Sequence, residues 1–266
     1  GGCSGAFVSA DGLIQTNHHC IRGTLSRIQS KVPNIHADGY YAQTLADEIT
    51  IPDLYVDQLL TITDVTKEIH SAMAAGKTND EKVKIKDAKI EELVSNAEKT
   101  SGLKCRVVEL YNGGKYSLYS YKRYTDIRLV MAPDVQIAAT GWDWDNFTYP
   151  RYELDFAFLR AYENGKPIKT NYYFTWSKKG ATEKEPVFTV GRPGNTDRLM
   201  SVQEIEYYNS TRNPAVLSRL NAAYGAYFEH FMANPARKQE LLGQLLSVAN
   251  GRKYYAGLQL ALNDEY

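Results

Sequence analysis

The stretch from residue 2 to residue 20 reads GCSGAFVSADGLIQTNHHC. Two short apolar runs flank Asp11-Gly12, and an Asp-Gly pair between apolar runs predicts a β-hairpin. Such a hairpin could place Cys3 beside Cys20, so that a disulfide would brace the strand end that carries His19. A histidine held in this way suits a general base, because proton transfer depends first on reach and orientation.

The composition is typical of a globular protein without a strong charge preference. The chain has 266 residues, enough for one large domain or two smaller ones, and 43% of them are hydrophobic. Lys and Arg together number 31, as do Asp and Glu, so no overall charge attracts the chain to nucleic acid or to an anionic membrane. No apolar run approaches the roughly 18 residues that a membrane span needs.

The three cysteines do not by themselves decide the cellular compartment. If Cys3 and Cys20 pair, Cys105 is left over, and the disulfide would imply an oxidising compartment. The chain opens on a strand-like motif without a signal peptide, and it ends soon after a helix-like run at residues 258–262. We therefore expect it to be part of a longer protein.

Hydrophobic patterns predict a mainly β region followed by a helical one. Strands are expected at residues 54–62, 105–110, 116–124, 127–131, 156–162 and 186–190. A capping box at residues 78–81 predicts a helix from about 81 to 99, whose Lys-rich face is solvated. Beyond about residue 203 the period becomes helical, and Pro214 suits the first turn of a helix.

Asp155 is a second candidate for chemistry, because it opens the apolar strand expected at residues 156–162. A carboxylate in this place tends to be buried and needs a partner, and the Nδ1–H of a histidine is the partner that a catalytic triad supplies. From this segment alone, an aspartate at a strand end or turn is the simpler interpretation. His19 is one of five histidines and is likewise open to a structural role.

No serine of the sequence has the surroundings of a nucleophile. The one small-residue loop with a serine is the GCSG stretch, and Ser4 lies in the same hairpin as His19, so we reject it. A metal site is the competing hypothesis, with Cys3, His18, His19 and Cys20 as its ligands. Neighbouring strand residues point to opposite faces and no CxxC or HxxxH spacing occurs, so we expect no metal and no cofactor.

The order of motifs along the chain resembles one known family. Besides residues 2–20, the motifs are DIRLV with AP at 126–133, DNF at 145–147 leading through PR to DF at 155–156, RAY at 160–162, and GRPG at 191–194. Together they resemble the catalytic domain of the bacterial dipeptidyl-peptidase 7 and dipeptidyl-peptidase 11 family of serine exopeptidases. The similarity runs in order over nearly the whole chain.

The resemblance implies a mainly β fold with added helices. Its catalytic domain would be a chymotrypsin-like double β-barrel, incomplete in this chain, with an inserted α-helical domain that caps the cleft. Residues 1–203 would be the N-terminal part of the catalytic domain, and residues 204–266 would be the start of the helical cap domain.

The same resemblance implies a serine dipeptidyl aminopeptidase that releases dipeptides from free peptide N-termini. His19 would be the general base and Asp155 its orienter, while Asn146 and Phe147 would hold the free amino terminus. The nucleophilic serine would lie beyond this chain, so these 266 residues alone are expected to be inactive. The family further implies a periplasmic or cell-surface location in bacteria and a homodimer.

A second hypothesis is a catalytically silent relative that keeps the fold and binds peptides. The sequence downstream of this chain would separate the two hypotheses, because a Gly-x-Ser-Gly loop there favours the enzyme.

Overall fold

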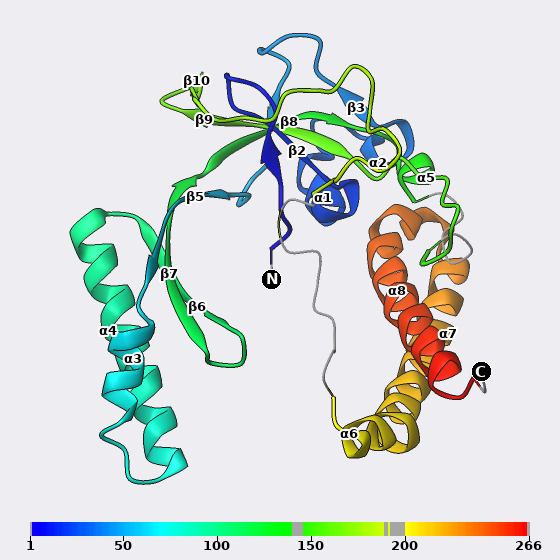
Figure 1. Ribbon diagram of the computed structural model, residues 1–266. Coiled ribbons are helices and arrows are strands. Elements are labelled where there is room, and N and C mark those ends of the chain that lie inside the picture. Colours follow the sequence, from blue (N-terminus) through cyan, green and yellow to red (C-terminus); the bar gives the residue numbers. More distant parts are fainter. Residues whose placement is uncertain (1, 140–145, 189–190, 192–199, 265–266) are drawn as a thin grey trace. The chain divides into compact units, whose positions relative to one another are not determined.

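The computed structural model describes residues 2–139, 146–188, 191 and 200–264 (Figure 1). Contacts divide the chain into two compact units. The first comprises Gly1–Pro52, Arg128–Arg160 and Pro167–Tyr266, and the second comprises Asp53–Ile127 and Ala161–Lys166.

An antiparallel sheet carries the predicted hairpin. Its strands are β1 (Ala6–Phe7), β2 (Leu13–Thr16), β3 (Tyr40–Tyr41), β4 (Ile49–Thr50), β8 (Asp126–Ala132), β9 (Ala157–Glu163) and β10 (Lys166–Pro167). The strand order is β1-β2-β9-β8-β3, with β4 paired to β8 and β10 paired to β9. In the hairpin, Phe7 pairs with Ile14, and Gly12 supplies the φ of 74° that this turn requires. The predicted hairpin is confirmed.

Short helices complete this part of the first unit. They are α1 (His18–Leu25), η1 (Ser26–Ile28), α2 (Ile35–Asp38) and α5 (Val135–Ala138). Ile21 and Leu25 of α1 are buried, and so are Leu129 of β8 and Leu159 of β9. Burial of each such side chain stabilises the fold by about 1.5–3 kcal/mol. The burial of Ile21 and Leu25 therefore fixes the position of α1.

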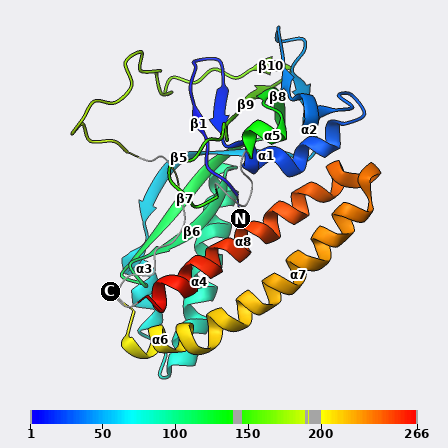
Figure 2. The same cartoon turned by 90° about the vertical axis from the view of Figure 1, so that its right-hand side faces the viewer.

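A helical segment begins at residue 202. It contains α6 (Val202–Tyr207), the π-helical turn η2 (Tyr208–Arg212), α7 (Asn213–Ala233), the 3₁₀ turn η3 (Pro235–Arg237) and α8 (Lys238–Leu262). α7 and α8 run side by side (Figure 2), and Leu245 and Ala249 of α8 are buried. Pro214 lies in the first turn of α7, as the sequence predicts. No helix in the described residues combines the length and the apolar character that crossing a membrane requires.

The second unit is a three-stranded antiparallel sheet with two helices. Its strands are β5 (Val56–Asp64), β6 (Lys104–Leu110) and β7 (Lys115–Tyr124) in the order β5-β7-β6, and its helices are α3 (Thr66–Met73) and α4 (Asn79–Ser101). Val65, Ile69 and Tyr116 form its buried centre. The capping box predicted for α4 is confirmed, with Thr78 and Glu81 each accepting from the other's backbone N–H.

The expected double β-barrel is not shown. Closure of a barrel requires the outermost strands of a sheet to pair. β1 and β3 end the main path of the larger sheet and β5 and β6 that of the smaller, so neither sheet closes within the described residues.

One further expectation differs from the structure. The strand expected at residues 186–190 is wrong for its described part, because residues 186–188 join no sheet. Residues 189–190 and positions 192–194 of the GRPG motif lie outside the described residues. The structure adds a feature that the sequence did not indicate, because residues 53–127 and 161–166 form a unit that contains a separate three-stranded sheet. The division near residue 203 into a catalytic and a cap domain stays a prediction.

Candidate active site

His19 lies in the first turn of a helix and not on a strand. β2 ends at Thr16, Asn17 takes the N-cap position with φ −80° and ψ 148°, and α1 begins at His18. The expectation that residues 18–20 alternate across a strand is therefore wrong. Successive helical side chains point about 100° apart. As a result His18 is fully buried, whereas the His19 side chain is 54% exposed.

The register of two strands brings Asp155 to His19. β2 and β9 are antiparallel with Thr16 opposite Ala157, so residues just after β2 lie beside residues just before β9. Asp155 Oδ2 lies 2.5 Å from His19 Nδ1, and Asp155 Oδ1 accepts a hydrogen bond from the His19 backbone N–H at 2.9 Å. The structure therefore brings these two candidates, 136 positions apart, into direct contact.

The surroundings of Asp155 keep its carboxylate ionised. Its side chain is 14% exposed, and this burial raises the pKa of Asp155. Hydrogen bonds from the side chain and backbone of His19 lower the pKa, and the electrostatic interactions of the carboxylate with His19 and with protonated His18 act in the same direction. The net result is a pKa below the ordinary value of an aspartate, so the carboxylate is charged at neutral pH.

His18 is a buried neutral imidazole beside this pair. Burial lowers the pKa of His18 to about 4, and the charges of Arg22, His36 and His19 lower it further, while Asp155 acts in the opposite direction. Neither ring nitrogen of His18 has a hydrogen-bond partner among the described residues. His18 is thus uncharged at neutral pH and buried away from solvent, whereas the His19 ring is accessible.

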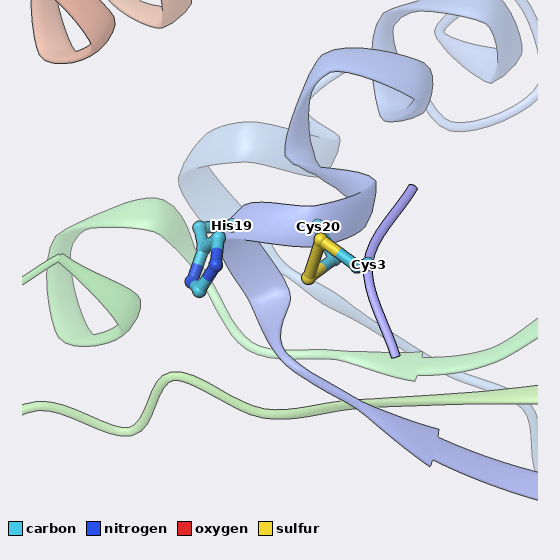
Figure 3. Close-up of side chains that lie close together, drawn as sticks. All are labelled: Cys3, His19 and Cys20. Atoms are coloured by element: carbon cyan, nitrogen blue, oxygen red, sulfur yellow. A yellow bond between two sulfur atoms is a disulfide. The ribbon is translucent and has the colours of Figure 1, made fainter. Parts of the chain in front are cut away.

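A disulfide joins Cys3 to Cys20, with a Cα–Cα distance of 5.8 Å. Figure 3 shows it beside His19 on the first turn of α1. Ligand atoms of Cys3, His19 and Cys20 lie within 4.8 Å of one another. Two sulfur atoms bonded to each other are not thiolate ligands, so the cluster has no metal-binding thiolates in this state.

Asn146 and Phe147 contact α8. Asn146 Nδ2 donates a hydrogen bond to Asn250 Oδ1 at 3.0 Å, and the Phe147 ring lies 6.0 Å from the Tyr254 ring between centroids. Phe147 is 58% exposed. Among the described residues, the hydrogen bonds and ring contacts of this pair are with α8 and not with the His19–Asp155 pair.

Sequence reasoning missed three residues that contact the candidates. Asn250 and Tyr254 are ordinary positions in a long helical pattern, and no local signal distinguishes them. Asn17 was visible in the TNHHC stretch, where an asparagine before an apolar-periodic segment is a helix-start signal that could have placed His19 on a helix.

Comparison with known proteins identifies the relatives of this chain. The family model described as Peptidase S46 matches residues 1–266. A dipeptidyl-peptidase 7 of Phocaeicola vulgatus is 31% identical over 238 residues, which cover 82% of this chain and 33% of that protein. An Asp/Glu-specific dipeptidyl-peptidase of Capnocytophaga gingivalis is 28% identical over 268 residues, which cover 97% of this chain and 38% of the relative.

Solved structures show the same fold. The crystal structure of Porphyromonas endodontalis DPP11 in complex with the dipeptide Arg-Glu matches 98% of this chain and 40% of that one, with a TM-score of 0.80 at 24% identity. The complex of that protein with Arg-Asp gives a TM-score of 0.82, also at 24% identity. At this identity the likeness establishes the fold alone. The family model spans the chain from end to end, and the chain therefore belongs to the Peptidase S46 family.

Proposed function

We propose that this chain supplies the general base and its orienting carboxylate to a serine dipeptidyl aminopeptidase that acts on free peptide N-termini. The observation that carries the proposal is the 2.5 Å contact between His19 Nδ1 and Asp155 Oδ2. Family membership and the relatives' names, which are those of dipeptidyl-peptidases, support the reaction class.

In this proposal the two ring nitrogens of His19 have different roles. Asp155 accepts the Nδ1–H, which holds the tautomer whose Nε2 is a base. Nε2 takes the proton of the serine hydroxyl as its oxygen attacks the scissile carbonyl, and then gives that proton to the leaving amine. Asp155 remains ionised and stabilises the imidazolium that forms in between.

The nucleophilic serine is assigned to the rest of the whole protein. The chain spans 33% and 38% of the length of the two relatives described above. The serine, the oxyanion donors and the pocket for the side chain before the cut are proposed to come from the remaining length. The 266 residues alone are accordingly expected to release no product from a dipeptidyl amide, and turnover by this chain alone would contradict that assignment.

Asn146 and Phe147 are proposed to hold the ammonium group of the peptide. Asn146 uses its Nδ2 to donate to Asn250, which leaves its Oδ1 as an acceptor for an ammonium group. The exposed ring of Phe147, next to Tyr254, offers an aromatic face to the same charge. Asn250 and Tyr254 belong to α8, so the segment proposed as the start of the cap domain takes part in this subsite.

Location and assembly are also proposals. The Cys3–Cys20 disulfide favours an oxidising compartment, which supports a periplasmic or cell-surface location. A homodimer and completion of the chymotrypsin-like double β-barrel by the rest of the protein remain predictions from the resemblance.

Peptide amides with free and with acetylated N-termini test the proposal on the full-length protein. Only the free form should be cleaved, and Asn146→Ala should lower kcat/KM about tenfold or more, as expected for losing a hydrogen bond to a charged group. Asn96→Ala, at an exposed position of α4, is the matched control. Equal cleavage of the acetylated form would contradict the proposal. Binding without turnover would instead identify the silent peptide-binding relative.

A further inference from the structure

Asn17 occupies the N-cap of α1 without capping that helix. An asparagine at this position ordinarily accepts a hydrogen bond from a backbone N–H of the first turn. The Asn17 side chain makes no such bond. The His19 N–H, second in the helix, donates instead to Asp155 Oδ1 at 2.9 Å. The carboxylate of Asp155, 136 positions from His19, therefore accepts the helix N–H that a cap side chain would ordinarily accept.

The freed amide of Asn17 turns toward the same carboxylate. Its Nδ2 donates to the main-chain oxygen of Asp155 at 3.0 Å and to Asp155 Oδ2 at 3.2 Å. The opposite orientation of the amide would place its oxygen against two acceptors, so the donor orientation is the one that chemistry permits. Asp155 Oδ2 is thus shared between Asn17 and the imidazole of His19.

We propose that Asn17 is a positioning residue that fixes the Asp155 carboxylate for His19. This inference rests on the proposed function. The two hydrogen bonds from His19 hold both carboxylate oxygens but tie them to one residue only. The Asn17 amide also donates hydrogen bonds to both the main chain and the side chain of Asp155. These bonds restrict rotation of the carboxylate about its bond to Cβ. Asn17 and the Asp155 carboxylate, neither of which transfers the proton, then fix the orientation of the His19 imidazole.

Three variants of Asn17 separate positioning from helix capping. Aspartate and serine are N-caps of about the same quality as asparagine, so neither should weaken α1. Neither reproduces the amide donor. Asn17→Ser and Asn17→Ala should lower kcat about tenfold or more, the usual effect of losing a hydrogen bond to a charged group. KM should change less than about twofold, because Asn17 is not assigned to substrate contact.

Asn17→Asp gives a readout that a structural role would not move. It places a second carboxylate beside Asp155, which favours the protonated form of the His19–Asp155 pair. The acid limb of kcat/KM should therefore shift to higher pH in this variant. Asn34→Asp is the matched control, because Asn34 is an exposed asparagine at the N-cap of α2 whose side chain also makes no cap hydrogen bond. It should leave both kcat and the pH profile as in the wild type.

The experiment uses the full-length protein with a dipeptidyl amide substrate, alongside ¹⁵N chemical shifts of the protein labelled only at histidine. The shifts report the tautomer of His19, assigned through His19→Ala, whether or not the protein turns over. We expect the Nδ1–H tautomer in the wild type and a mixture of tautomers in Asn17→Ala. An active wild type with Asn17 variants of unchanged kcat would overturn the inference and leave the proposed function standing. An inactive wild type would overturn the function, and the tautomer of Asn17→Ala would then decide the inference, with an unchanged tautomer rejecting it.

Discussion

The buried imidazole of His18 should make the stability of the protein depend on pH in the acid range. In an unfolded chain, a histidine titrates with a pKa of about 6.5. In the folded protein, burial lowers the pKa of His18 to about 4. Between these two values the unfolded state binds more protons, so the free energy of unfolding falls as the pH falls from about 6.5 toward 4. Above about pH 6.5 the contribution is fully present.

The magnitude follows from the interval between the two pKa values. This interval corresponds to a change of about 3 kcal/mol in the free energy of unfolding, since each tenfold change in affinity for a proton is about 1.4 kcal/mol. His18 is fully buried, so solvent does not screen the effect. The positive charges of Arg22, His36 and His19 oppose protonation of His18, and only Asp155 favours it. A loss of this size is a large fraction of the stability of a typical domain.

Substitution of His18 by leucine tests this reasoning, because leucine keeps a side chain of similar bulk and cannot titrate. Urea unfolding from about pH 4.5 to 7.5, followed by circular dichroism and tryptophan fluorescence, measures the slope of stability against pH. All three tryptophans belong to the sequence of the first unit, which contains His18. The variant should show a weaker slope than the wild type, and His230→Gln, at an exposed site on α7, should keep the wild-type slope. Equal slopes in the wild type and His18→Leu would show that His18 is not a source of the pH dependence.

Two further predictions concern the framework around the site. Cys3→Ser should lower the free energy of unfolding by about 3 kcal/mol, because the disulfide joins residues separated by 17 positions, and Cys105→Ser serves as the control for a cysteine outside the bond. A loss below about 1 kcal/mol in thermal or urea unfolding would contradict this. Arg160→Met should cost about 3–5 kcal/mol, because it removes the guanidinium that bonds at 2.9 Å to the buried carboxylate of Glu48. The double variant with Glu48→Met should recover most of that loss, and the absence of any recovery would argue against coupling between the two residues.

Local signals predicted those parts of the fold that depend on neighbouring residues. Asp11-Gly12 between apolar runs predicted the hairpin, and the Thr78–Glu81 capping box predicted α4. The start of α1 was missed although Asn17 is a local signal for it, because the side chain that accepts the helix N–H is not that of Asn17. Asp155, distant in sequence, accepts the helix N–H that an adjacent residue would ordinarily take.

The architecture beyond these elements depends on strand pairing over long sequence separations. The pairing of β2 with β9 and the separation of β5, β6 and β7 into their own sheet leave no trace in local periodicity. A strand also needs a partner, which is why the apolar residues 186–188 form none despite their composition.

The sequence pointed to the candidate residues of the site but not to the residues that contact them. His19 and Asp155 were named from a motif and a family resemblance, and the strand register then explains why they meet. The contacts of Asn146 and Phe147 with α8 depend on the packing of a helix about 100 positions away, which no pattern in the sequence indicates.

We propose that His19 and Asp155 act as one pair in peptide-bond hydrolysis. The decisive measurement is the steady-state kinetics of the full-length protein on a dipeptidyl amide, comparing the wild type with His19→Ala and Asp155→Asn. We predict near-background turnover for His19→Ala and a loss in kcat of about 10⁴-fold for Asp155→Asn, which keeps the shape but lacks the carboxylate that selects the tautomer. Substantial turnover by either variant, with unfolding like that of the wild type, would show that the two residues do not act as a catalytic pair.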